Sequence, residues 1–293
     1  MTFLSNLING ISLGSVYAII ALGYTMVYGI AKMLNFAHGD VIMIGAYISF
    51  CATTYMELPP IVSVIIAMVV CTMLGILIEG LAYKPLRKAT SLAVLITAIG
   101  VSYFLQNVAL LIWGSNPKTF RSVVQLESVS LFDNKLIITA ESILTVLSCI
   151  VIMIALTIFT KKSKMGKAMR AVSEDKDAAE LMGINVNVTI SVTFAIGSAL
   201  AAIAGVLLCS AYPVLQPTTG SMPGIKAFTA AVFGGIGSIP GAMLGGILLG
   251  IIEIFSKSYI STQLSDAIVF AVLIVVLLVK PTGILGKKTK EKV

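Results

Sequence analysis

Long apolar stretches separated by short polar ones make up most of this chain of 293 residues. The hydrocarbon core of a bilayer is about 30 Å thick, and about 20 helical residues cross it. Leu264–Val279 is shorter than this but apolar enough to cross. Because no stretch alternates with a period of two, the pattern predicts transmembrane helices rather than a barrel. Five stretches reach the full length with at most one or two charges: Leu7–Ala31, Ile61–Tyr83, Ser91–Trp113, Leu136–Thr160 and Thr189–Ala211.

Two further apolar regions are interrupted by residues that break helices. Val41–Met56 follows a polar segment, and Ile225–Phe255 contains the sequence Gly-Gly-Ile-Gly-Ser-Ile-Pro-Gly at residues 234–241. With the uninterrupted stretches they give about eight spans, of which one or two are broken or re-entrant. The predicted fold class is therefore all-α, a polytopic bundle of transmembrane helices.

The composition narrows the class of protein. Hydrophobic residues make up 58% of the chain and charged residues 11%, whereas soluble domains have about 45–50% and about 25%. So few charges exclude soluble enzymes, nucleic-acid binders and disordered proteins. The four cysteines lie in apolar runs without disulfide or metal spacing, so we expect buried apolar residues. Met1–Asn6 lacks the basic region of a signal peptide, so the first apolar stretch is expected to remain as a membrane helix.

Lysine and arginine are unevenly distributed over the connections between spans. Fifteen lie in one set, formed by Lys32, Lys84–Lys88, Lys161–Lys176 and Lys280–Lys292. The other set has five: Lys118, Arg121, Lys135, Lys226 and Lys257. Since basic loops stay on the cytoplasmic side, we expect the first set and the C-terminus to be cytoplasmic. The net charge of +7 then needs no nucleic-acid partner. The N-terminus is expected outside if Val41–Met56 crosses fully, and inside if it is re-entrant.

The longest connection on the predicted cytoplasmic side is residues 161–187. Its first half is basic, and its second half predicts a short helix with Ser173 as N-cap, acidic residues near the first turn and Gly183 at the end. Ala178, Leu181 and Met182 would share one small apolar face. Such a helix is suited to docking on another protein. A solvated connector with a local helix remains the alternative, although a plain connector needs only a few residues.

The polar segment Asn35-Phe-Ala-His-Gly-Asp40 contains His38, the only histidine of the chain. Ionisable groups at membrane depth are rare and often functional. Alternatively, the segment is an interfacial turn in which Asp40 caps the next helix and His38 is solvated.

At residues 234–241 the glycines and Pro240 make a continuous helix improbable. Unwound backbone inside a membrane must be satisfied by protein or by a wet cavity, and paired breaks point to a transport path. The alternative is a tight turn between two short helices. The two breaks together give these candidate path residues: Asn35, Phe36, His38, Asp40, Gly234, Gly235, Gly237 and Ser238.

Small residues recur at a spacing of four, as in Gly10-xxx-Gly14, Gly197-xxx-Ala201 and Gly246-xxx-Gly250. This spacing favours close helix packing, within the chain or against a partner. Glu253 is the deepest acidic residue, and we expect a turn near the outer interface there. The sequence has no G-x-x-x-x-G-K-[ST] motif, so we expect no ATP site. We also expect no catalytic residue, cofactor or metal.

The sequence resembles LivH-type permeases, the membrane subunits of bacterial branched-chain amino acid ABC transporters. The similarity runs from about Asn9 to Gly286 and is weakest over residues 114–136. The motifs that carry it are Gly23-Tyr-Thr-Met-Val-Tyr-Gly29, Asn35–Asp40, the loop Lys164–Asn185, Lys226–Ala242 and Pro281-Thr-Gly-Ile-Leu-Gly286.

The resemblance implies a single transmembrane permease domain over residues 1–293, with residues 161–187 as its cytoplasmic coupling loop. The implied ATPase-coupling residues are Ser173, Glu174, Asp175, Ala178, Leu181, Met182 and Gly183. The implied partners are a LivM-like second permease, two cytoplasmic ATPase subunits, and a periplasmic or extracellular binding protein that delivers leucine, isoleucine or valine. All would work at the inner membrane bilayer of a bacterium. An ion-coupled secondary transporter acting alone is the alternative function, and a membrane-embedded enzyme is disfavoured.

Overall fold

The computed structural model describes residues 2–87, 89–124, 127–131 and 136–286, and it confirms the predicted all-α membrane bundle. Two short strand pairs, β1 with β4 and β2 with β3, accompany the helices. The strands are β1 Lys118–Thr119, β2 Val129–Leu131, β3 Leu136–Ile138 and β4 Val214–Leu215. The helices are α1 Thr2–Ala31, α2 His38–Thr54, α3 Pro60–Ile78, α4 Ser91–Trp113, α5 Ala140–Lys162, α6 Lys164–Glu174, α7 Lys176–Leu181, α8 Val186–Ala211, α9 Ser221–Gly234, α10 Ile239–Tyr259 and α11 Ser265–Val279.

Six helices of the described residues are long and apolar enough to cross a membrane: α1, α3 with its continuation to Leu86, α4, α5, α8 and α10. The apolar α11 has 15 residues, α2 has 17 and α9 has 14. At 1.5 Å per residue, α2 and α9 extend only about 26 and 21 Å. Residues 136–138, which we expected to open a span, form strand β3 instead, and α5 begins at Ala140.

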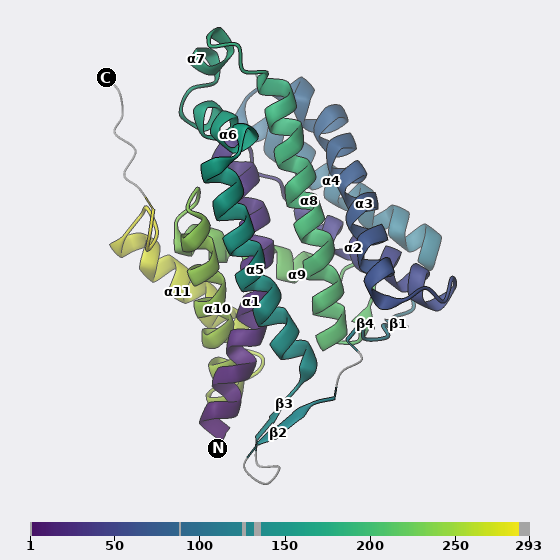
Figure 1. Cartoon of the computed structure of the whole chain (residues 1–293). Coiled ribbons are helices and arrows are strands. Elements are labelled where there is room, and N and C mark those ends of the chain that lie inside the picture. Colours follow the sequence, from purple (N-terminus) through teal and green to yellow (C-terminus); the bar gives the residue numbers. More distant parts are fainter. Residues whose placement is uncertain (1, 88, 125–126, 132–135, 287–293) are drawn as a thin grey trace.

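The two ends of the bundle differ (Figure 1). One end bears α6 and α7 and is called the loop end; the other bears the four strands and the N-terminus and is called the strand end. The chain therefore starts at the end opposite α6 and α7. Lys88, Lys135 and the basic residues from 287 to 293 lie outside the described residues.

α1 and α10 form the closest helix pair, and glycines explain how. Gly10 and Gly14 of α1 face Gly246 and Gly250 of α10. A Cβ atom on Gly14 would lie 2.6 Å from the Cα of Ile247, so a larger residue would push the two backbones apart. The predicted small-residue motif therefore packs helices within the chain.

The helices fall into two units of the same order, α1–α4 and α8–α11. In each unit a long helix is followed by a break, a short helix, a returning helix and a peripheral helix. α1 packs against α10 as α8 packs against α3, and the short helices α2 and α9 contact each other. Since α1 starts at the strand end and α8 at the loop end, the units run in opposite directions (Figure 1). This arrangement is an inverted repeat.

Candidate functional site

The first break is the segment 32–37 between α1 and α2. α2 begins at His38, and its N-cap residue, Ala37, makes no side-chain capping bond. Asp40 lies in the first turn rather than at the cap, and only 2% of its surface is exposed. His38 is 1% exposed. The alternative of an interfacial turn with Asp40 as cap and His38 solvated is therefore wrong.

His38 fills a slot between helices α1 and α8. A Cβ atom on Gly23 would lie 2.6 Å from its Nε2 atom, and a Cβ atom on Gly197 would lie 3.8 Å from its Cε1 atom. The ring of Tyr24 packs against the imidazole at a centroid distance of 4.6 Å. Nε2 has no hydrogen-bond partner among the described residues. The two glycines thus make room for a buried imidazole that is held mainly by packing.

Asp40 is joined to two other helices through one side chain. Its Oδ1 accepts a hydrogen bond of 2.9 Å from Nε2 of Gln106 in α4. The same nitrogen lies 3.3 Å from the hydroxyl of Ser221, the first residue of α9. Close by, the starts of α2 and α9 touch, since a Cβ atom on Gly39 would lie 2.7 Å from the carbonyl oxygen of Gly220. Gln106 therefore connects both short helices at their point of contact.

The second predicted break, at residues 234–241, is a tight turn between α9 and α10, as the alternative had it. Gly235 and Gly237 have φ of 105° and 91°, which glycine adopts readily. Ser238 caps α10 by accepting a 3.2 Å bond from the Gly241 N–H. The backbone N–H of Leu285 donates to the Gly234 carbonyl at 2.9 Å, so the end of the described chain covers this turn.

The break inside the second unit lies instead at residues 212–220, before α9. The number of crossings had led us to place Pro213–Gly224 in an outward-facing connection. Only the contact between the starts of α2 and α9 places its end inside the bundle. The inverted order of the two units was the signal that sequence reasoning missed.

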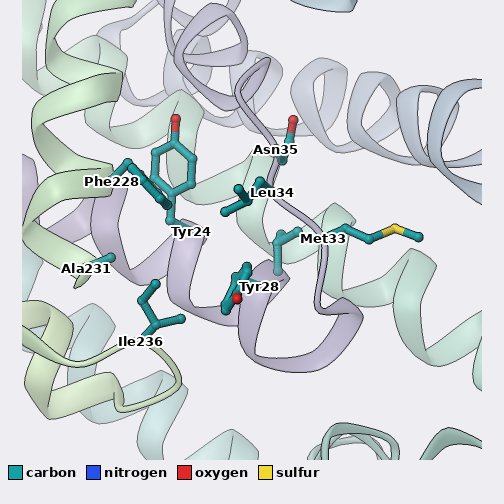
Figure 2. A pocket seen from close by; sticks show the side chains of 9 residues that line it. Tyr24, Tyr28, Met33, Leu34, Asn35, Phe228, Ala231 and Ile236 are labelled. Carbon is teal, nitrogen blue, oxygen red and sulfur yellow. The ribbon is translucent and has the colours of Figure 1, made fainter. Parts of the chain in front are cut away.

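A small, mostly apolar pocket lies where the first break meets the α9–α10 turn (Figure 2). In Figure 2 the side chains of Tyr24 and Phe228 stand together on one side, and Ile236 approaches from the turn. Asn35 is buried, and its Oδ1 accepts a 2.9 Å bond from the Tyr83 hydroxyl. The pocket is lined by Tyr24, Val27, Tyr28, Met33, Leu34, Asn35, Phe228, Ala231 and Ile236. The two predicted segments therefore meet at the loop end of the bundle.

The connection at residues 161–187 forms two helices rather than one. The predicted N-cap, Ser173, is wrong: it lies in the last turn of α6, where its hydroxyl donates to the Arg170 carbonyl at 2.7 Å. Asp175 caps α7 by accepting bonds of 3.0 Å from the Asp177 and Ala178 N–H groups. α6 continues past Ser173 because its buried residues Met169 and Val172 hold that turn against the bundle. Gly183 ends α7 with φ of 81°, as expected.

The apolar face predicted on this loop is exposed. Leu181 is 89% and Met182 82% exposed, and Ala178 is also exposed. In the described part of the chain, α7 packs against α6 and the beginning of α8. Large apolar side chains outside the bilayer region favour contact with another protein.

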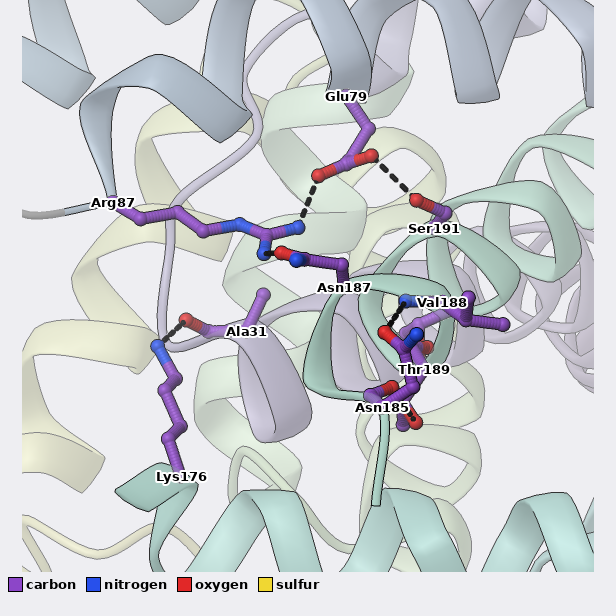
Figure 3. Close-up of polar contacts among 10 residues, drawn as sticks. Ala31, Glu79, Arg87, Lys176, Asn185, Asn187, Val188, Thr189 and Ser191 are labelled. Carbon is purple, nitrogen blue, oxygen red and sulfur yellow. Dashed lines mark hydrogen bonds and ion pairs between the residues drawn. The ribbon is translucent and has the colours of Figure 1, made fainter. Parts of the chain in front are cut away.

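Polar contacts tie α7 and the start of α8 to the bundle (Figure 3). Lys176 Nζ donates a 2.9 Å bond to the carbonyl of Ala31, the last residue of α1. Arg87 bonds both Asn187 of α8 and the buried Glu79, which follows α3 in the π-helical segment Glu79–Tyr83 (η1). Partial burial, Arg87 and Lys32 lower the pKa of Lys176. The loop is thus joined to α1, just before the first break, and to α3.

A buried charged cluster joins α1 and α9–α11. Glu253 is 1% exposed, and its Oε1 accepts bonds of 2.8 Å from Lys226 and 2.6 Å from Lys257. Tyr17 donates to its Oε2 at 2.9 Å, and Lys226 also pairs with Asp266 at 2.7 Å. The turn expected at Glu253 is therefore wrong, since the residue lies within α10. Likewise Lys226, which we had placed in a loop, is a buried residue of α9.

Comparison with known proteins gives full-length matches. The family model described as branched-chain amino acid transport system / permease component matches residues 6–277. The LivH permease protein of the high-affinity branched-chain amino acid transport system of Salmonella typhimurium is 48% identical over 99% of this chain and 98% of its own. BraD of Pseudomonas aeruginosa is 47% identical over the same shares. A probable LivH protein of Methanocaldococcus jannaschii is 30% identical over 93% of this chain and 89% of its own.

Proposed function

Because this chain belongs to the family of branched-chain amino acid transport permease components, we propose that it is a membrane-spanning subunit of an ATP-driven importer of leucine, isoleucine and valine. The observation that carries the proposal is the short helix α7, which holds exposed Leu181 and Met182 beyond the transmembrane helices. A chain without an ATP-binding motif needs an external motor, and this helix offers a surface for it.

In this proposal α7 docks on one of two ATPase subunits, and residues 1–293 form one permease domain with residues 161–187 as its coupling loop. The contact residues are Ser173, Glu174, Asp175, Ala178, Leu181, Met182 and Gly183. The basic residues of the loop end favour its placement on the cytoplasmic side, with the C-terminus there too. The strand end would face the binding protein, and a LivM-like permease would complete the path in the inner membrane of a bacterium.

The path itself would run past the contact between α2 and α9. Asn35 and Phe36 come from the first break, and His38 and Asp40 come from the start of α2; all four are at least partly buried. The turn with Gly234, Gly235, Gly237 and Ser238 would form the cytoplasmic exit with the pocket of Figure 2. Motion of α7 would reach this exit through the bond from Lys176 to the end of α1.

Reconstitution tests the proposal. The chain is co-expressed with two candidate ATPases, a second permease and a binding protein, and ATP-dependent leucine uptake into liposomes is measured. Leu181→Asp should abolish uptake and co-purification of the ATPase, because a charge replaces the centre of the apolar face. Ile137→Asp is the matched control, since Ile137 is exposed on β3 at the strand end. Equal co-purification of the ATPase with both variants would refute docking through α7.

A second candidate function is ion-coupled transport by the chain alone. One observation favours it: among the described residues, Asp40 is a buried carboxylate without a basic partner within 4.0 Å. Buried acids of this kind carry protons or ions in some carriers. Leucine uptake by the purified chain in liposomes, driven by a proton or sodium gradient without ATP, would support this function over the first.

A further inference from the structure

The short helices α2 and α9 hold equivalent places in the two units, and each carries a side chain with a formal charge that bonds the peripheral helix of its own unit. On α9, Lys226 pairs with Asp266 of α11 at 2.7 Å. On α2, Asp40 accepts from Gln106 of α4 at 2.9 Å. The bonds differ in kind: one joins two opposite charges, and the other joins a carboxylate to a neutral amide.

The charge balance around the two residues is therefore unequal. Lys226 and Lys257 face Glu253 and Asp266, so two positive charges meet two negative ones. Within the described residues no lysine, arginine or histidine forms an ion pair with Asp40, although the residue is 2% exposed. A buried carboxylate is costly unless a cation or several donors compensate it. Neutral donors such as the Gln106 amide supply no compensating positive charge.

We propose that Asp40 binds the α-ammonium group of the amino acid as it passes between α2 and α9, displacing the amide of Gln106. The inference rests on the proposed function and adds the group that recognises the substrate. An ammonium donates up to three hydrogen bonds, and a charged N–H···O⁻ bond is about twice as strong as a neutral one. The ammonium group of the substrate thus supplies the positive charge that no described side chain places beside Asp40.

The place of α4 explains how the substrate reaches this carboxylate. α4 packs mainly against α2 and the π-helical segment η1 and leaves large side chains such as Tyr103, Phe104 and Leu111 exposed. A displacement of α4, which carries Gln106, would open the way to this carboxylate. A metal ion is a poorer candidate, because no group of three acidic, histidine or cysteine side chains forms a site among the described residues.

Two substitutions separate a substrate site from a structural bond, using the complete transporter in liposomes. Asp40→Asn removes the charge at nearly constant size and should lower leucine uptake about 10- to 100-fold, the range expected for a lost bond to a charged group. ATP hydrolysis without binding protein should stay as in the wild type. Asn107→Leu is the matched control: Asn107 is exposed on the same helix, its side chain bonds only the Tyr103 carbonyl, and the variant should keep most of the uptake.

Wild-type uptake by Asp40→Asn would overturn the proposal, because a neutral side chain would then suffice. Equal losses in Asp40→Asn and Asn107→Leu would overturn it too, since the loss would then not be specific to the carboxylate. If Asp40→Asn does not assemble, the wild type is labelled during turnover with a hydrophobic carbodiimide. Leucine should protect Asp40, and labelling that leucine does not reduce would refute the site. Failure of the wild type to take up leucine would instead defeat the proposed function.

Discussion

The unit α8–α11 and the unit α1–α4 repeat the same order of helices but differ in how their interiors are held. In the first, charges of both signs join α9 to α10 and α11, with Tyr17 of α1 added. In the second, neutral groups join α2 to α4: the Gln106 amide donates to Asp40, and the Trp113 indole N–H donates to the Cys51 sulfur at 3.1 Å. In one unit ion pairs thus join the short helix to its peripheral helix, and in the other neutral groups do so.

Of the substitutions that test this comparison, replacement of Lys226 should have the largest effect on stability. Lys226→Met leaves Glu253 and Asp266 with one lysine, and breaking a buried pair costs about 3–5 kcal/mol. We expect a large drop in the thermal unfolding temperature of the complex in detergent. Lys257→Met is the control: its side chain is 35% exposed, so it should cost about 1 kcal/mol or less. Similar unfolding temperatures for the two variants would mean that the buried ion pairs of Lys226 do not stabilise the unit α8–α11.

A smaller effect tests the packing of the two units. A Cβ atom on Gly250 would meet the backbone of Gly14, so Gly250→Ala should destabilise the bundle by about 1–3 kcal/mol. Gly100 of α4 has no atom within 4 Å of such a Cβ atom, and Gly100→Ala should be neutral or stabilise by up to about 1 kcal/mol. Thermal unfolding of both variants measures the difference. A loss of stability in Gly100→Ala would show that α4 is held more tightly than the structure indicates.

Removing the side-chain bond of Lys176 should change stability least, but it should clearly weaken the coupling of ATP hydrolysis to leucine uptake. Lys176→Met removes the bond to the Ala31 carbonyl and should cost less than about 1 kcal/mol, as partly exposed polar bonds do. Leucine uptake per ATP hydrolysed should nevertheless fall, because α7 loses its link to α1. Both rates are measured in the same liposomes. Lys167→Met on α6 is the control, since Lys167 is exposed and its side chain makes no hydrogen bond within the described chain. Unchanged uptake per ATP in Lys176→Met would assign the bond no part in coupling.

Much of the fold could be predicted because the bilayer leaves few options. Uninterrupted apolar runs marked the long helices, and the polar segment before His38 marked the first break. The break before α9 escaped notice because prolines and glycines in a polar stretch look alike in an exposed loop and in a re-entrant one. The cap of α7 fell two residues from its expected position, since the burial of Met169 and Val172 extends α6. The pairing of Lys226 with Glu253 depends on how α9 packs on α10, and local patterns do not report this.

The strand pair β1–β4 has a mechanical consequence. Lys118 and Thr119 follow α4 and pair with Leu215 and Val214 after α8, and the Phe120 N–H adds a 3.2 Å bond to the Pro213 carbonyl. These backbone bonds fasten the first unit to the second at the strand end. A force applied at α7 would therefore rotate the helices about the strand end, and the displacement would be largest at the loop end.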